Sequence, residues 1–138
     1  MRIVIDNNVI IDALKPNPGF EADAQEILRL ASAKAIDGFV SANSLTDIFY
    51  VIRKDRGADT AKMMIQKLVL MLDIIGIEPA DCLAALEKPM NDFEDAVVDV
   101  CAQKVSADSI VSRDEQFIKA ETSVKVVTPR QLLDSIKA

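Results

Sequence analysis

Short apolar runs alternate with helical patterns along this chain, and this alternation constrains its fold more than any other feature. The first run, Ile3-Val4-Ile5, is continuously apolar, which is typical of a parallel strand buried on both faces. Further short runs lie at about 38–41, 73–77, 109–111 and 125–127. Because parallel strands are joined by helical crossovers, the pattern predicts an α/β fold with a mainly parallel sheet.

Helical stretches fill the segments between these runs. Ser44 is predicted to cap a long helix that Gly57 ends, and Thr128-Pro129 to begin the last helix. The chain has no repeat, linker or low-complexity segment, so we expect one domain over residues 1–138. The apolar spacing predicts helices at about 9–14, 21–34, 45–56, 59–72, 79–87, 93–104 and 129–136, with a short helical turn around 117–118.

The composition is that of an ordinary folded protein. The 138 residues are 50% hydrophobic, which is enough for a core without disulfides. No apolar run reaches membrane-spanning length, and the first residues carry no secretory signal pattern. Cys82 and Cys101 lie in helical patterns without metal-like spacing, so we expect reduced thiols in the core. Together these features predict a cytoplasmic protein that does not associate with membranes.

The charge and the absence of histidine narrow the possible chemistry. The net charge is −6, from 22 acids and 16 bases, which is the wrong overall sign for binding nucleic acid. Metal ions on the acids, or a basic partner, would remove that objection. Without histidine the chain has no histidine general base, Ser-His-Asp triad or histidine-bound zinc. Its chemistry therefore has to rely on carboxylates.

An acidic helix is predicted at 93–104. Asp92, Asp95 and Asp99 follow a three-then-four spacing, which places them on one helical stripe beside the apolar one. Like charges at this spacing repel each other, so something should offset the cost. One alternative is local: Asp92 caps the helix and Asp95 takes the third helical position, as in a capping box.

Acids from other parts of the chain should meet this helix. In a parallel α/β sheet, the carboxyl ends of the strands and the amino ends of the helices share one edge, where ligands bind. Asp6 ends the first strand, Asp47 lies in the first turn of the next long helix, and Asp114 follows the fourth strand. Each could be a separate helix cap. We favour the alternative in which they form one carboxylate site with Asp92 and Asp95.

Such a site suits a hard divalent cation. Oxygen ligands without histidine or cysteine favour Mg²⁺ or Mn²⁺, which keep several waters and bind a few carboxylates and substrate phosphates. A metal of this kind lowers the pKa of a bound water and stabilises a phosphoryl transition state. The implied reaction is phosphodiester hydrolysis.

The same residues carry a family resemblance that runs nearly end to end. The chain resembles the PIN-domain nucleases, and most of all the small single-domain branch that includes the VapC-like toxins of type II toxin–antitoxin systems. This resemblance implies an α/β/α sandwich with a five-stranded sheet in the order 3-2-1-4-5, an RNA substrate, an antitoxin partner and a homodimer. The segments that match are 6–10, 41–48, 92–96 and 111–114, followed by the closing 127–129.

The resemblance also implies roles for individual residues. Asp6, Asp95 and Asp114 take the metal-binding acid positions of the family. Asp47 completes the catalytic acids, although the family more often has Glu there, so this carboxylate reaches one methylene less far. Asn7 falls where many members have Thr or Ser.

Further residues have supporting roles in this scheme. Asn8 and Ser112 match positions that orient the acids or a water, and Asp92 and Asp99 are auxiliary acids. Arg113, next to Asp114, is a candidate for a contact to the substrate phosphate.

The leading hypothesis is a metal-dependent endoribonuclease, the toxin of a toxin–antitoxin pair. One alternative is a non-catalytic PIN-like scaffold that binds RNA or protein. Another is a receiver-type phospho-signalling domain, which would need an Asp at the end of the third strand, where Ile77-Glu78-Pro79 stands instead.

Overall fold

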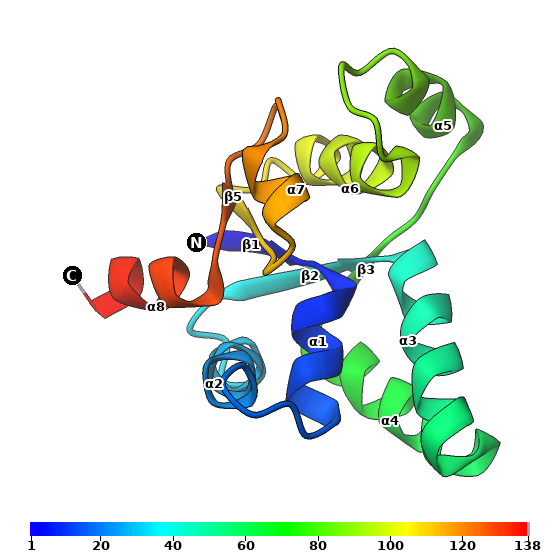
Figure 1. Cartoon of the computed structure of the whole chain (residues 1–138), viewed down its shortest axis with the longest axis vertical. Helices are drawn as coiled ribbons and strands as arrows, with labels where there is room; N and C mark the ends of the chain where they lie inside the picture. Colours follow the sequence, from blue (N-terminus) through cyan, green and yellow to red (C-terminus); the bar gives the residue numbers. More distant parts are fainter. Residues whose placement is uncertain (138) are drawn as a thin grey trace.

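Five parallel strands form one sheet in the order β3-β2-β1-β4-β5, which is the predicted order (Figure 1). The structure, a computed structural model, describes residues 1–137. Successive residues of the central strand point to opposite faces: Ile3 and Ile5 belong to one core, and Val4 belongs to the other. The strands are β1 (Arg2–Ile5), β2 (Asp37–Ser41), β3 (Asp73–Ile75), β4 (Ser109–Val111) and β5 (Val126–Val127).

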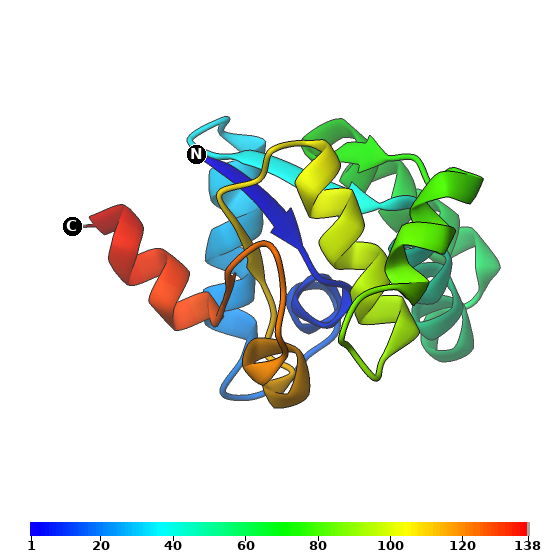
Figure 2. The ribbon, with the colours of Figure 1, turned by 90° about the horizontal axis from the view of Figure 1, so that it is seen from above.

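Helices cover both faces of the sheet, as Figures 1 and 2 show from two directions. Within residues 1–137 no helix is both long enough and apolar enough to span a bilayer. One face carries α1 (Asn7–Leu14), α2 (Glu21–Ser32), α3 (Ala42–Arg56), α4 (Ala58–Met71) and α8 (Pro129–Lys137). The other carries α5 (Pro79–Leu86), α6 (Phe93–Lys104) and α7 (Glu115–Lys119).

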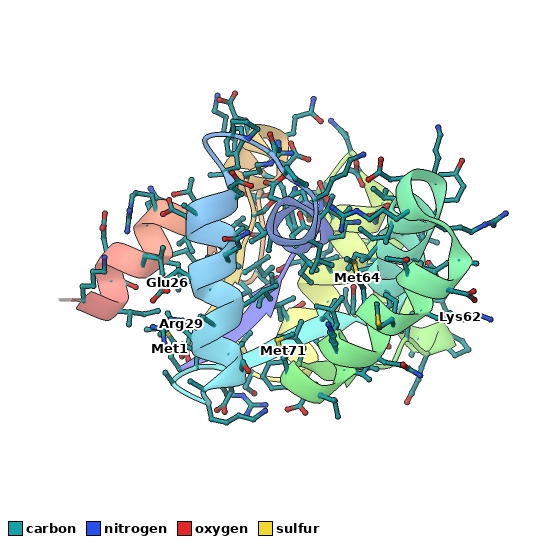
Figure 3. All side chains as sticks on the ribbon, turned by 90° about the horizontal axis from the view of Figure 1, so that it is seen from below. Met1, Glu26, Arg29, Lys62, Met64 and Met71 are labelled. Carbon is teal, nitrogen blue, oxygen red and sulfur yellow. The ribbon has the colours of Figure 1, made fainter. Side chains whose placement is uncertain are left out.

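The outer helices are amphipathic, as their apolar spacing predicts. In α4, Met64 and Met71 pack against the core, whereas Lys62 extends into solvent (Figure 3). On the outer side of α2, Glu26 and Arg29 form an exposed ion pair one turn apart. Hydrophobic burial on the inner side, rather than such surface pairs, holds these helices to the sheet.

Two sequence-based boundaries are wrong. The third strand ends at Ile75 rather than Ile77. Helix α3 begins at Ala42, directly after β2, so its N-cap is Ser41 and not Ser44. Ser44 lies in the first turn, where its hydroxyl is 2.9 Å from that of Ser41. Gly57 does end α3, with a φ of +89° that a side chain would make costly.

The topology places a switch point between β1 and β4. From β1 the chain crosses to β2 on one side, and from β4 it crosses to β5 on the other, so the connections diverge at this point. Such a switch point, at the carboxyl ends of the strands, is where open α/β sheets bind ligands. The Asp6 amide donates to the carbonyl of Val111 at 3.0 Å, so the two strands stay paired up to this edge.

Candidate acidic active site

Acidic side chains from four segments lie at the switch-point edge. Asp6 follows β1 and is the N-cap of α1, and Asp114 follows β4 and is the N-cap of α7. Asp92 and Asp95 stand at the start of α6. Asp47 lies on α3, one turn further into the helix than predicted, because α3 begins at Ala42. The structure thus brings the separate acids to one edge of the sheet.

Asp6 is buried and held by a network of polar groups. Its side chain is 3% exposed. One carboxylate oxygen accepts from the backbone amide of Asn7 at 3.0 Å. The other accepts from the hydroxyl of Ser112 at 2.8 Å and from the side-chain amide of Asn8 at 3.1 Å. Ser112 also accepts from the backbone amide of Asp114 at 3.1 Å, so this network fixes both strand ends.

Asn7 links two helices of the site. Its side-chain amide donates to the Asp47 carboxylate at 3.2 Å and to the Glu94 carboxylate at 3.1 Å. A Thr or Ser hydroxyl, with one proton to donate, could not hold both acids in this way. Sequence reasoning missed Glu94, since the spacing argument on this helix considered only Asp92, Asp95 and Asp99.

The pKa values of these acids are shifted by burial and by their crowding. The pKa of Asp95 is raised from 3.8 to about 7, chiefly by burial and then by the charges of its neighbours, which are, in order of decreasing effect, Asp92, Asp6, Asp114 and Glu94. This agrees with the expectation that crowded carboxylates repel each other, with loss of solvent as the larger cause.

The neighbouring acids shift in the same direction. Burial raises the pKa of Asp6, against hydrogen bonds from Ser112 and Asn7 that lower it. The pKa of Glu94 is raised by burial and then by the charges of Asp47 and Asp6. Ionising all these carboxylates together is therefore unfavourable without a counter-ion, and a bound cation would offset that cost.

A cavity of about 440 Å³ opens beside Asp92 and Asp95, between the loop that precedes α6 and helix α7. Gln116 and Lys119 line its opposite side. Lys119 is exposed and places a cation across the cavity from the acids, where a phosphate could contact it. No sequence pattern distinguished Lys119 from other surface lysines.

Asp99 does not join the other acids. It is fully buried, and its carboxylate pairs with Lys88 at 2.8 Å and accepts from the backbone amides of Ser123 and Val124 at 2.8 and 2.9 Å. The structure therefore gives Asp99 a different environment from Asp95, although the spacing put both on one stripe. Its contacts are those of a residue that holds the segment before β5.

Arg113 is also engaged elsewhere. Its guanidinium forms a bidentate ion pair with buried Asp12, in which the distance from Nη2 to Oδ1 is 3.1 Å. It is thus turned toward α1 rather than toward the acids.

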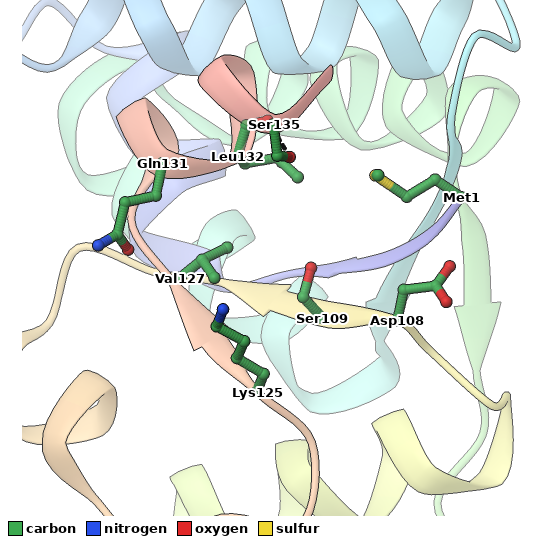
Figure 4. Close-up of a pocket in the computed structure, with 8 residues that line it drawn as sticks. All are labelled: Met1, Asp108, Ser109, Lys125, Val127, Gln131, Leu132 and Ser135. Carbon is green, nitrogen blue, oxygen red and sulfur yellow. Dashed lines mark hydrogen bonds between the residues drawn. The ribbon is translucent and has the colours of Figure 1, made fainter. Parts of the chain in front are cut away.

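Another cavity lies at the opposite edge of the sheet (Figure 4). It measures about 330 Å³, and Met1, Asp108 and Lys125, which line it, stand just before β1, β4 and β5. The acids that converge at the switch point are absent from its lining. It is therefore not a second half of the acidic site.

The donor set of the acidic site fits a hard divalent cation, since every candidate ligand is a carboxylate oxygen. In the part of the chain that the structure describes, no group of three or more Asp, Glu, His or Cys side chains is arranged so that it could hold a metal ion by itself. Mg²⁺ does not need such a group, because it commonly binds one or two carboxylates and fills its other positions with water and substrate phosphate.

Comparison with known proteins confirms the resemblance drawn from the sequence segments. A family model described as "PIN domain" matches residues 2–116. Ribonuclease VapC1 of Aquifex aeolicus (strain VF5) is 27% identical over 130 residues, which cover 89% of this chain and 88% of that protein.

Solved structures share the fold. VapBC2 from Rickettsia felis, bound to a DNA fragment from its promoter, has a TM-score of 0.70 at 15% identity and covers 93% of this chain and 98% of its own. A toxin–antitoxin complex from Klebsiella pneumoniae has a TM-score of 0.68 at 18% identity, covering 92% and 97%. VapC20 of Mycobacterium tuberculosis, described as a Sarcin-Ricin loop cleaving toxin, has a TM-score of 0.65 at 14% identity. The match covers 83% of this chain and 92% of that one. At such identities the likeness establishes the fold alone.

Proposed function

This chain belongs to the PIN domain family, and on that premise we propose that it is an endoribonuclease that hydrolyses RNA phosphodiester bonds with a carboxylate-bound Mg²⁺ or Mn²⁺. The observation that carries the proposal is the convergence on Asp95, where Asp6, Asp92 and Asp114 add their charges at the switch point of the sheet. The similarity to a protein named as a ribonuclease gives independent support.

The proposed metal-binding acids are Asp6, Asp95 and Asp114, of which one or two would bind the ion directly and the rest through bound water. Asp47 is the proposed fourth catalytic acid. A divalent ion bound there would neutralise the carboxylates, generate hydroxide from water and polarise the scissile phosphate. Asn7 holds Asp47 in place through a bond of 3.2 Å.

The surrounding side chains orient the acids and the substrate. Asn8 and Ser112 fix the Asp6 carboxylate, so its lone pairs have a set direction before substrate binds. Asp92 lies beside Asp95 as an auxiliary acid, and Lys119 would contact a phosphate from the far side of the cavity. These roles would give a preorganised electrostatic site, and electrostatic stabilisation of this kind is usually the largest single contribution to enzyme catalysis.

We also propose a protein partner. The similar structures from Rickettsia felis and Klebsiella pneumoniae are toxin–antitoxin complexes, which supports an antitoxin that binds and silences this chain in the cytoplasm. A basic antitoxin segment would complement the acidic site and the net charge of −6. A homodimer is proposed on the family resemblance.

A cleavage assay separates this function from the scaffold alternative. Purified protein is incubated with structured and with unstructured RNA in Mg²⁺, in Mn²⁺ and in EDTA. We expect internal cleavage that needs the divalent ion. A protein that binds these RNAs but never cuts them, at any metal concentration, would be a scaffold instead.

A further inference from the structure

A smaller cavity, of about 290 Å³, adjoins the acidic site without including its acids. It lies between the loop before α2, helix α7 and the start of α8, which come together at the carboxyl edge of the sheet (Figure 2). Arg113 and Glu115, which line it, flank Asp114 in the chain. Its other main lining residues are Phe20, Ile118, Pro129 and Arg130.

One wall of this cavity is a fixed aromatic platform. The Arg113 guanidinium lies 4.7 Å from the centroid of the Phe20 ring, in a cation–π contact. Asp12, only 3% exposed, holds the guanidinium by two nitrogens and accepts from the Asn17 side chain at 2.7 Å. These contacts immobilise both the arginine and the loop that carries Phe20. The ring is therefore positioned before any ligand arrives.

The platform nevertheless remains open to solvent. Phe20 is 46% exposed, and its ring has no polar atom that could hydrogen-bond to the surrounding water. Ile118 and Pro129 extend the apolar wall. An exposed, preorganised aromatic next to apolar side chains is the arrangement on which single-stranded nucleic acids stack their bases.

The charges around the cavity also favour a base inside and phosphate outside. Glu115 and Asp23 line it and would repel a phosphate, but their oxygens can accept from the amino groups of a base. Arg130 stands at the rim with its side chain 52% exposed. Its ion pairs to Asp23 and Asp134 are 3.3 and 3.4 Å long and exposed, so exchange for a backbone phosphate costs little.

We propose that this cavity binds one unpaired nucleobase of the RNA chain, stacked on Phe20, with Arg130 contacting the adjoining phosphate. The proposal rests on the proposed function, because it names a recognition subsite for the same substrate. It implies that the cut lies near a nucleotide that can leave its helix, so unpaired segments are preferred over continuous duplex.

A tryptophan at position 20 tests this directly, because the chain contains no other tryptophan. Phe20→Trp protein is titrated with a short single-stranded RNA in EDTA, where no cleavage occurs. We expect saturable quenching of the fluorescence. An oligonucleotide of the same length and charge that lacks its bases should give at least about fivefold weaker binding, as stacking is worth roughly 1–3 kcal/mol per base.

Leu70→Trp provides the matched control. Leu70 is 80% exposed near the end of α4, just before β3, and so lies toward the opposite edge of the sheet. Its fluorescence should not respond to RNA. Tyr50→Trp tests an alternative RNA-binding surface, because Tyr50 is an exposed aromatic residue beside the basic residues Arg53 and Lys54. Quenching there and not at position 20 would overturn the proposal.

Cleavage kinetics give the second readout. Phe20→Leu should raise KM for single-stranded RNA at least about fivefold and leave kcat nearly unchanged. Phe20→Tyr, which keeps an aromatic ring, should have a KM close to that of the parent. Equal KM values for Phe20→Leu and the parent would refute the subsite while leaving the ribonuclease proposal standing. Base-dependent quenching in a protein that cuts no RNA would do the reverse: the subsite would stand as a binding site and the ribonuclease proposal would fail.

Discussion

The Asp92 carboxylate accepts a hydrogen bond from the backbone amide of Asp95 at 3.0 Å, which makes Asp92 the cap of α6. The Asp95 carboxylate itself makes no hydrogen bond within residues 1–137, although the residue is only 8% exposed. Helix capping, one of the two alternatives for this stretch of sequence, is therefore supplied by the Asp92 side chain. Asp95 is left free to face the other acids.

Replacing Asp95 should abolish most of the activity. We expect Asp95→Asn to lower the rate of RNA cleavage by at least ~100-fold, because a lost electrostatic contact in a catalytic site costs several kcal/mol. The measurement is the initial rate in Mg²⁺ or Mn²⁺, with EDTA as the blank. Asp59→Asn is the control, since Asp59 is an exposed acid in the first turn of α4 and should leave the rate unchanged. A full parental rate in Asp95→Asn would assign the activity to another site or a contaminant.

Changing the length of the side chain at position 47, which lies on α3, gives a second test of the proposed metal site. Asp47→Glu, which restores the residue more common in the family, should keep activity or lower the Mn²⁺ concentration for half-maximal cleavage. Asp47→Ala should abolish cleavage without unfolding, because its contact to Asn7 is only one bond of 3.2 Å. Metal titrations of the three proteins measure this. An inactive Asp47→Glu with an unchanged fold would show a site built for the shorter acid.

Asp99 should matter for stability rather than for catalysis. Asp99→Asn leaves Lys88, whose side chain is only 12% exposed, without its counter-charge. Breaking a buried pair in this way costs about 3–5 kcal/mol. Urea unfolding should therefore show a large fall in the midpoint, while Asp134→Asn, at an exposed acid of α8, changes it little. A variant that loses activity at parental stability would return Asp99 to the site.

Asp95 and Asp99 share one stripe of α6 but lie in different environments, and the sequence alone does not predict this difference. Helical spacing gives the direction of a side chain from the axis, but α6 is buried along most of its length, from Asp95 to Ala102. One turn along the same stripe, the neighbours change from acids at the sheet edge to Lys88 and the backbone before β5. That change depends on tertiary packing.

The fold was more accessible to prediction than the site. Alternating runs predict a parallel α/β sheet because burial on both faces leaves a direct signature in Ile3-Val4-Ile5. The order of the strands came from the resemblance, since periodicity does not encode it. Glu94 and Lys119 carry no local signal, because their neighbours come from other segments of the chain. The orienting contacts of Asn8 and Ser112 to Asp6 are of the same kind, and only the resemblance pointed to them.

The last prediction concerns metal-free stability and follows from the raised pKa of Asp95. A folded pKa of about 7 against an ordinary 3.8 means that the folded protein holds this proton more tightly than the unfolded chain does. The associated stability is present below pH ~4 and is lost as the pH rises through 7. Asn cannot ionise, so Asp95→Asn is spared that loss.

In EDTA, Asp95→Asn and the parent should melt at nearly the same temperature at pH 4, and the variant should melt higher at pH 7.5. The gap is about 2–5 °C if roughly 1 kcal/mol of repulsion and desolvation is relieved. Excess Mn²⁺ should stabilise the parent by mass action and the variant much less, which closes or reverses the gap. A role for Asp95 in the helix dipole predicts the opposite sign, since the lost charge is worth ~0.3–1 kcal/mol there. Melting curves at both pH values, with EDTA and with Mn²⁺, decide the matter. A variant that melts lower in EDTA and gains as much from Mn²⁺ as the parent would make Asp95 a helix-end charge, and the metal assignment would fail with it.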